Sequence, residues 1–68
     1  MKLSARNQLQ GKVTSITKGP ATANVVVDVA GNRLVSSITV EAAEELGLSE
    51  GSDVVVVIKA SDVIIATA

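Results

Sequence analysis

Apolar and polar residues alternate along most of the first half of the chain, which is the pattern of half-buried β-strands. It predicts strands over about Gln8–Thr17, Ala21–Val29 and Arg33–Thr39. Within the first of these, the apolar positions change parity between Val13 and Ile16. Because a shift of one residue turns every side chain to the other face, this change predicts a β-bulge near Thr14 or Ser15.

The period changes after the third predicted strand. An Ala- and Glu-rich stretch, Glu41–Leu48, predicts a short helix that Gly47 can end in a left-handed conformation. After a turn at Ser49–Ser52, the continuous apolar run Val54–Ile58 predicts a strand covered on both faces, and Val63–Thr67 predicts a last strand. The element order indicates a single domain over residues 1–68, mainly β: a five-stranded OB-like small barrel with one short helix between strands 3 and 4.

The composition of this 68-residue chain excludes several kinds of chemistry. It has no Cys and no His, so it lacks thiolate metal ligands, disulfides, and the commonest general base and zinc ligand. It has no Phe, Tyr or Trp for stacking on bases, and 6 Lys+Arg against 7 Asp+Glu give a net charge of −1. We therefore expect neither an enzyme nor a nucleic-acid-binding protein.

The chain is unusually apolar for its size, with 47% hydrophobic residues and a mean hydropathy of +0.45. A domain this small buries only about 60% of its unfolded surface, so we expect a homo-oligomer that covers the excess. The longest apolar run, Val54–Ile58, is far shorter than a membrane span, and the polar start of the chain is no signal peptide. The expected location is the cytoplasm, without a membrane partner.

Three polar clusters each combine one cation with Gly or Ser donors: Ser4–Gln8, Lys18–Pro20 and Lys59–Ser61. Arginine, lysine, hydroxyl and backbone N–H groups are the donors that a small oxyanion requires. Taken singly, Ser4–Gln8 is better explained as a solvated N-terminus and Lys59–Ser61 as a lysine at a strand end, and Lys18–Pro20 is equally well explained as a turn. The carboxylates Glu41, Glu44 and Glu45 are interpreted as a solvated helix face rather than a metal or general-base site.

Segments spread over nearly the whole chain resemble the molbindins, small proteins made of one molybdate/tungstate-binding (Mop) domain. The segments that carry the resemblance are Ser4–Leu9, Lys18-Gly19, Ser37–Thr39, Glu44–Leu48, Glu50-Gly51, Val57–Ala60 and Val63–Ala66. The resemblance implies a homo-hexamer, a trimer of dimers, of OB-like subunits that hold oxyanions at their interfaces.

By that resemblance, Ser4 and Arg6 of one subunit and Lys59 and Ala60 of its neighbour hold the anion. Family members often carry Ser at position 42, where this chain has Ala42, whose backbone N–H can still donate. The full expected site, with no direct side-chain ligand to the metal, is Ser4, Ala5, Arg6, Asn7, Ala42, Lys59, Ala60 and Ser61. A second oxyanion site is expected around Lys18, Gly19, Pro20 and Ala21.

The expected function is therefore a cytoplasmic store or buffer for molybdate or tungstate, bound as the oxyanion. Two alternatives remain from the residues themselves. One is an OB-type nucleic-acid-binding module, which the absent aromatics and the acidic balance argue against. The other is a purely structural oligomeric scaffold.

Overall fold

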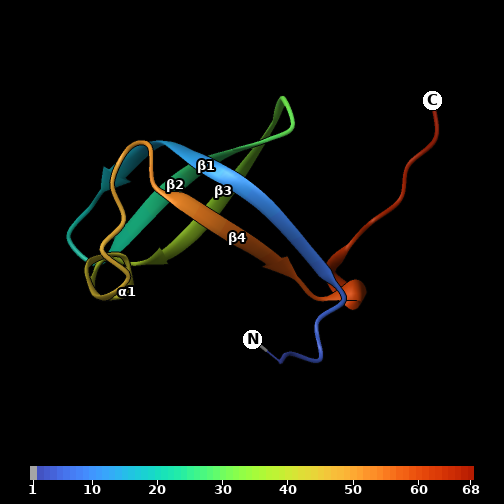
Figure 1. Cartoon of the computed structure of the whole chain (residues 1–68), viewed down its shortest axis with the longest axis horizontal. Coiled ribbons are helices and arrows are strands. Elements are labelled where there is room, and N and C mark those ends of the chain that lie inside the picture. The colour runs from blue at the N-terminus through green and yellow to red at the C-terminus, as the bar shows by residue number, and fades with distance from the viewer. Residues whose placement is uncertain (1) are drawn as a thin grey trace.

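A four-stranded antiparallel sheet forms most of the protein in a computed structural model that describes residues 2–68. The strands lie in the order β3-β2-β1-β4, with a short helix between β3 and β4 (Figure 1). The elements are β1 (Asn7–Lys18), β2 (Thr22–Val29), β3 (Asn32–Thr39), α1 (Val40–Glu45), β4 (Asp53–Ile58) and a 3₁₀ turn η1 (Ala60–Asp62). Within these residues, no helix is both long and apolar enough to span a membrane.

The predicted alternation of β2 and the predicted bulge in β1 are both confirmed. Val25 and Val27 are buried while Asn24 and Asp28 are exposed, as a strand with one covered face requires. The register between β1 and β2 shifts at Thr14, between Val13 and Ser15. Thr14 is the extra residue, and its hydroxyl donates a hydrogen bond to the carbonyl of Val26 over 3.3 Å.

The core consists of small aliphatic side chains on the inner face of the sheet. Val13, Val25 and Val27 are buried at its centre. Half-buried hydrophobic residues surround them: Ile16, Val29, Ile38, Leu48, Val54 and Val56. The absence of any aromatic residue explains why so many positions are needed to fill this core.

Local hydrogen bonds, made by residues next to its two ends, fix where helix α1 starts and ends. The hydroxyl of Thr39 caps the start by accepting from the backbone N–H of Ala42 at 3.0 Å. At the end, Gly47 adopts a φ of +65°, and the N–H of Leu48 donates to the carbonyl of Ala43 at 3.1 Å. The predicted left-handed Gly47 is confirmed, but the helix ends at Glu45, three residues before the predicted end at Leu48.

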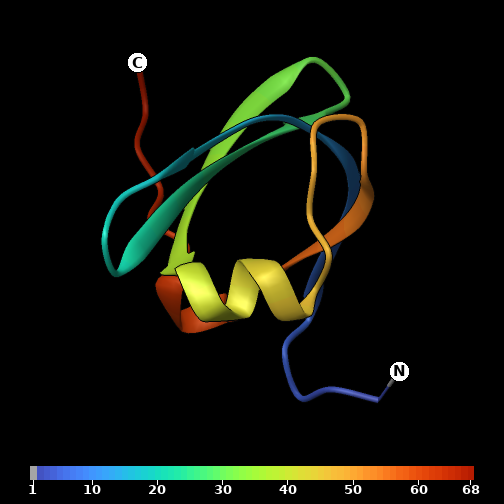
Figure 2. The ribbon, with the colours of Figure 1, turned by 90° about the vertical axis from the view of Figure 1, so that its left-hand side faces the viewer.

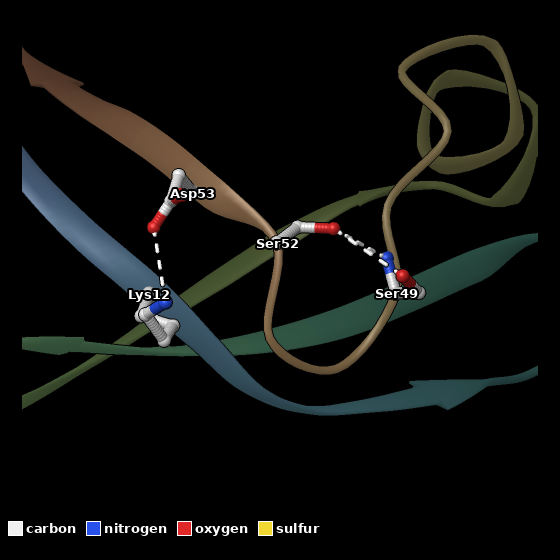
Figure 3. A network of polar contacts seen from close by, with 4 residues as sticks. All are labelled: Lys12, Ser49, Ser52 and Asp53. Carbon is white, nitrogen blue, oxygen red and sulfur yellow. Dashed lines mark hydrogen bonds and ion pairs between the residues drawn. The ribbon is translucent and has the colours of Figure 1, made fainter.

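The turn Ser49–Ser52 connects the helix to β4 and is fastened to the bulge in β1. Inside the turn, the N–H of Ser49 donates to the hydroxyl of Ser52 over 3.0 Å (Figure 3). The backbone of Val13 bonds to both Gly51 and Ser52, at 2.8 Å and 3.0 Å. Because β4 begins directly after this turn, these bonds help to fix the register in which it pairs with β1.

The predicted fifth strand, and with it the closed barrel, is the main difference from the sequence analysis. Val63–Thr67 forms no strand; it extends away from the sheet after η1, with Ile64 91% and Ile65 83% exposed (Figure 1). The sheet is curved but open between its edge strands β3 and β4 (Figure 2). The segment has the apolar, β-branched composition of a strand. A strand also needs a sheet edge to pair with, and here the segment pairs with none.

Strand β4 also differs from its prediction in one respect. Its inner residues Val54 and Val56 pack against the core, but Val55 and Val57 are 44% and 41% exposed. The expectation that both faces of this strand are covered is therefore wrong for a single chain. The continuous apolar run shows only that both faces are suited to burial.

Candidate oxyanion-binding site

Two of the polar clusters predicted from the sequence meet at one end of the β1–β4 ladder. The last residue pair of this ladder is Asn7 with Ile58. Arg6 and Lys59 are the next residues outward on the two chains, so their backbones leave the sheet side by side. Figures 1 and 2 show the N-terminal segment and the η1 turn at this same end of the molecule.

The groups at this end are cationic or neutral donors. Arg6 and Lys59 are exposed, and among the described residues neither takes part in an ion pair; the ion pair observed joins Lys12 to Asp53 at 3.2 Å (Figure 3). Ser4 and Ser61 add exposed hydroxyl groups at the same end. The nearest carboxylate in the sequence is Asp62, which lies in the η1 turn.

The neighbouring backbone is ordered by short local hydrogen bonds. The side-chain amide of Gln8 donates to the carbonyl of Ala5 over 3.4 Å, which holds the segment before Asn7 close to the first strand. On the other side, the N–H of Asp62 donates to the carbonyl of Lys59 at 2.9 Å and closes the η1 turn around Ala60. These bonds involve none of the side chains of Ser4, Arg6 and Lys59, which leaves those side chains to solvent or a ligand.

Ala42 and the second predicted cluster lie elsewhere. The carbonyl of Ala21 accepts from the N–H of Val40 at 2.9 Å, so the β1–β2 turn adjoins the start of α1. Figure 1 shows this region at the end of the sheet opposite η1. One chain therefore places the donors at two separate ends, and it does not bring Ala42 to Arg6 and Lys59.

The backbone donors at this second end are already engaged. The N–H of Ala42 donates to the Thr39 hydroxyl at 3.0 Å, and the N–H of Gly19 donates to the carbonyl of Thr22 at 2.8 Å. An anion at either position would have to compete with a protein acceptor. Lys18 is exposed and is the remaining charged donor of this cluster.

Sequence reasoning missed an apolar cavity of about 470 Å³ between the edge strands β3 and β4. Its lining comes mainly from inward-facing residues of three strands and from the end of the helix region: Val25, Val27, Ser36, Ile38, Leu46, Leu48 and Asp53–Val57. The alternation in the sequence predicts which strand residues face inward, but the predicted fifth strand, Val63–Thr67, would have filled the space between β3 and β4. No polar cluster of the oxyanion site lies in this cavity.

Comparison with known proteins identifies the family. A family model, the TOBE domain, matches residues 3–65. Molybdenum-pterin-binding protein 1 from Clostridium pasteurianum is 50% identical over 66 residues, which cover 96% of this chain and 97% of that protein. The chain belongs to the TOBE domain family, and its resemblance to the molbindins is confirmed.

Solved molbindin structures share the fold as well as the sequence. A molybdate-binding protein from Sporomusa ovata superposes with a TM-score of 0.94 at 36% identity, over 98% of this chain and 100% of that one. The cytoplasmic molybdate-binding protein ModG, in a form with molybdate bound, gives 0.89 at 45% identity over 94% of this chain. This chain covers 46% of the ModG chain, so it corresponds to about half of that molecule.

The part of the chain that the structure describes offers no cluster of side chains that could coordinate a metal ion directly. Residues 2–68 contain no group of three His, Cys, Asp or Glu side chains that converge on one point. The chemistry of the Arg6–Lys59 end is instead that of hydrogen-bond donors, which bind a charged ligand through its oxygen atoms.

Proposed function

We propose that this chain binds molybdate as the intact oxyanion and serves as a passive, non-catalytic store or buffer for it in the cytoplasm. One observation supports the proposal: the β1–β4 ladder ends at the pair Asn7–Ile58, so Arg6 and Lys59 come next on the two chain segments, and within residues 2–68 neither takes part in an ion pair. Tungstate, a dianion of nearly the same size and shape, is expected to bind at the same place.

The relatives support the same ligand class. The Sporomusa protein is described as molybdate-binding, and ModG was solved with molybdate bound. The Clostridium relative is named for molybdenum and a pterin together. In this chain the absence of Phe, Tyr and Trp leaves no aromatic ring to stack on a pterin, which favours the free oxyanion.

The donor set matches the charge and the hydrogen-bonding needs of a tetrahedral dianion. The guanidinium of Arg6 and the ammonium of Lys59 together carry two positive charges, and a dianion carries two negative ones. The oxygens of molybdate accept but do not donate at neutral pH, so a site made of donors satisfies them without an acceptor. The hydroxyls of Ser4 and Ser61 and the backbone groups of Ala5, Asn7 and Ala60 complete the proposed set.

The exposed position of these donors supports a site completed by another subunit. A dianion held by two exposed cations alone would be weakly bound, because water screens such pairs. Exposed large apolar residues near the N-terminus, in β3 and β4, after α1 and after η1 provide surface for association: Leu3, Leu9, Val35, Leu46, Val55, Val57, Val63, Ile64 and Ile65. We propose a homo-hexamer in which Ala42 and the Lys18–Ala21 turn of other subunits approach bound anions.

Calorimetric titration with sodium molybdate tests the proposal with three matched variants. Arg6→Ala should weaken binding roughly 10- to 100-fold, because a hydrogen bond to a charged group contributes about 1.5–3 kcal/mol. Ser4→Ala should weaken it less, by about 0.5–1.5 kcal/mol. Arg33→Ala removes the same charge from β3, the edge strand opposite β4, next to the β2–β3 hairpin. This control should leave the affinity unchanged.

An oligonucleotide titration in the same buffer separates the alternatives. Equal losses for Arg6→Ala and Arg33→Ala would indicate an unspecific charge effect and contradict the site. Binding of the oligonucleotide in preference to molybdate would favour the nucleic-acid module. An absence of binding to either would favour the purely structural scaffold.

A further inference from the structure

The donor segment before β1, Ser4–Arg6, receives little support from the sheet. The β1–β4 ladder begins at Asn7, so within residues 2–68 the segment has no partner strand, and its backbone bends at Ser4. Ser4 and Arg6 are both exposed. Fixing a free backbone costs conformational entropy at each residue. A mobile segment would bear this cost whenever it bound an anion, and its affinity would be lower for that reason.

One side chain connects this segment to the sheet. Nε2 of Gln8 donates a hydrogen bond to the carbonyl oxygen of Ala5 over 3.4 Å, and within residues 2–68 no other side chain bonds to the segment. The backbone of Gln8 is itself fixed, because Gln8 pairs with Val57 one position inside the Asn7–Ile58 pair. Gln8 therefore links the N-terminal donors to the same ladder that leads into Lys59.

The peptide group held by Gln8 contains a donor as well as an acceptor. The described peptide bonds are trans, and in a trans peptide the C=O of one residue and the N–H of the next point in opposite directions. Because the C=O of Ala5 is directed to Gln8, the N–H of Arg6 points the other way, and no carbonyl within residues 2–68 accepts from this N–H. The bond thus engages an acceptor that would repel an anion, and it leaves the donor of the same peptide available.

We propose that Gln8 is a positioning residue of the oxyanion site: its side chain holds the Ala5–Arg6 peptide in the conformation that binds the anion, without touching the anion itself. The inference rests on the proposed function and adds to it a residue outside the donor set. Apparent affinity falls in proportion to the fraction of molecules in the binding-competent conformation. A side chain that raises this fraction in the free protein therefore tightens binding without a contact of its own.

Calorimetric titration of the full chain with sodium molybdate measures the contribution of Gln8. Gln8→Met keeps the length of the side chain but removes the donor, and it should weaken binding about 2- to 10-fold, the effect of one neutral hydrogen bond. Gln8→Glu should weaken binding further, because a carboxylate cannot donate to the carbonyl of Ala5 and adds a negative charge two residues from Arg6. Only this additional loss should shrink at high salt, which screens exposed charges.

Gln10→Met is the matched control for Gln8→Met. Gln10 lies two residues further along β1, on the same face of the strand, and it is exposed as Gln8 is. Within residues 2–68 its side chain makes no hydrogen bond. The control should therefore bind molybdate with the affinity of the unaltered chain.

Backbone ¹⁵N relaxation of the anion-free protein separates positioning from direct contact. In the unaltered chain, the order parameters of the Ala5 and Arg6 N–H groups should approach the value of about 0.85 that is typical of rigid backbone, and Gln8→Met should lower them below about 0.6. Saturating molybdate should raise them again in the variant, because the bound anion itself orders the segment. A side chain that only contacted the anion would leave the anion-free order parameters unchanged, and a loss of overall packing would lower them throughout β1.

Two results would overturn the positioning role and leave the proposed function intact. One is equal affinity of the unaltered chain and Gln8→Met while Arg6→Ala still weakens binding. The other is a set of anion-free order parameters at Ala5 and Arg6 that Gln8→Met does not change. Equal losses for Gln8→Met and Gln10→Met would also overturn the positioning role. An unaltered chain that binds no molybdate would overturn the proposed function, and the positioning role with it.

Discussion

Gly11 of β1 and Val27 of β2 lie so close that a β-carbon on Gly11 would stand 2.6 Å from Cγ1 of Val27. The carbonyl oxygen of Asp28 and Cγ2 of Val29 would lie at 2.8 Å and 2.9 Å. Since β-carbons do not approach other atoms this closely, the neighbouring strands β1 and β2 can lie at this distance only with glycine at position 11. A glycine inside a strand is typical of such a close approach of two backbones.

Gly11→Ala is therefore expected to lower the free energy of unfolding by about 1–3 kcal/mol, the usual cost of overpacking a core. Urea denaturation at a fixed protein concentration measures the change. Gly19→Ala is the matched control, because its nearest neighbour, the carbonyl oxygen of Thr22, lies at an ordinary 3.4 Å. Equal effects of the two substitutions would show that the close packing at Gly11 is relieved without cost.

The strands of this fold could be predicted from the sequence because their signals are local. The alternation over Ala21–Val29 and the parity change near Thr14 follow from the pleat of a strand, whatever it pairs with. Strand pairing between distant segments is not local, and Val63–Thr67 shows the difference: its composition is that of a strand, but it pairs with no edge of the sheet in its own chain.

The candidate site divides in the same way. The donors of the Arg6 and Lys59 clusters could be recognised by residue type, but their adjacency follows from the pairing of Asn7 with Ile58, which no local pattern specifies. Ala42 illustrates the opposite limit. The sequence alone leaves its backbone N–H free to bind an anion. In the structure this N–H instead donates to the hydroxyl of Thr39, which caps the helix.

Ala30 adopts a φ of +49° in the two-residue turn between β2 and β3, followed by Gly31 at +85°. Positive φ at both central positions is typical of a type I′ hairpin turn, where Asn-Gly is the preferred pair. Ala30→Asn should raise the free energy of unfolding by about 0.5–1 kcal/mol, because Asn adopts the left-handed region with less strain than Ala.

Thermal unfolding provides the measurement, and the expected rise in melting temperature is roughly 2–8 °C for a domain of this size. Ala21→Asn is a suitable control, since Ala21 is equally exposed but its φ is not positive. A lower melting temperature for Ala30→Asn would show that the strain at Ala30 is already relieved by its surroundings.

Ala42→Ser should increase the affinity for molybdate by up to about tenfold, which corresponds to one added neutral hydrogen bond of 0.5–1.5 kcal/mol. The backbone N–H of Ala42 is engaged by Thr39, so a side-chain hydroxyl would supply a donor that the present residue lacks. Within one chain, helix α1, which contains Ala42, lies at the end of the sheet opposite η1 and the N-terminal segment, so a gain requires a second subunit to complete the site.

Titration of Ala42→Ser and of the double variant Ala42→Ser/Arg6→Ala distinguishes one shared site from two. Non-additive changes in binding free energy would indicate that both residues contact the same anion. Additive changes would place them at separate anions, and no change for Ala42→Ser would remove position 42 from the proposed site.

Selectivity among oxyanions is the most demanding test of a site made of donors. Phosphate is partly protonated at pH 7, and its O–H group must donate to an acceptor. The side chains of Arg6 and Lys59 provide none, and a hydroxyl of Ser4 or Ser61 that accepted from it would give up its own hydrogen bond to the anion, so binding costs about 1–3 kcal/mol. Phosphate should therefore compete at least several-fold less well than molybdate in displacement titrations.

Asp62, in the η1 turn, is the nearest carboxylate to Lys59 in the sequence, and it provides the matched variant. If Asp62 accepted the phosphate proton, Asp62→Asn would weaken phosphate binding and leave molybdate binding intact.

Sulfate carries no proton, so it can be rejected only by size: donors fixed at the spacing of the larger molybdate reach sulfate oxygens through lengthened hydrogen bonds. Rigid donors are expected here because Lys59 directly follows β4, the η1 turn is closed by its own backbone hydrogen bonds, and the proposed neighbouring subunit holds the exposed side chains from the other side. Tungstate should then displace molybdate at equal concentration and sulfate should not; displacement by sulfate as readily as by tungstate would show a general anion site without a fixed spacing.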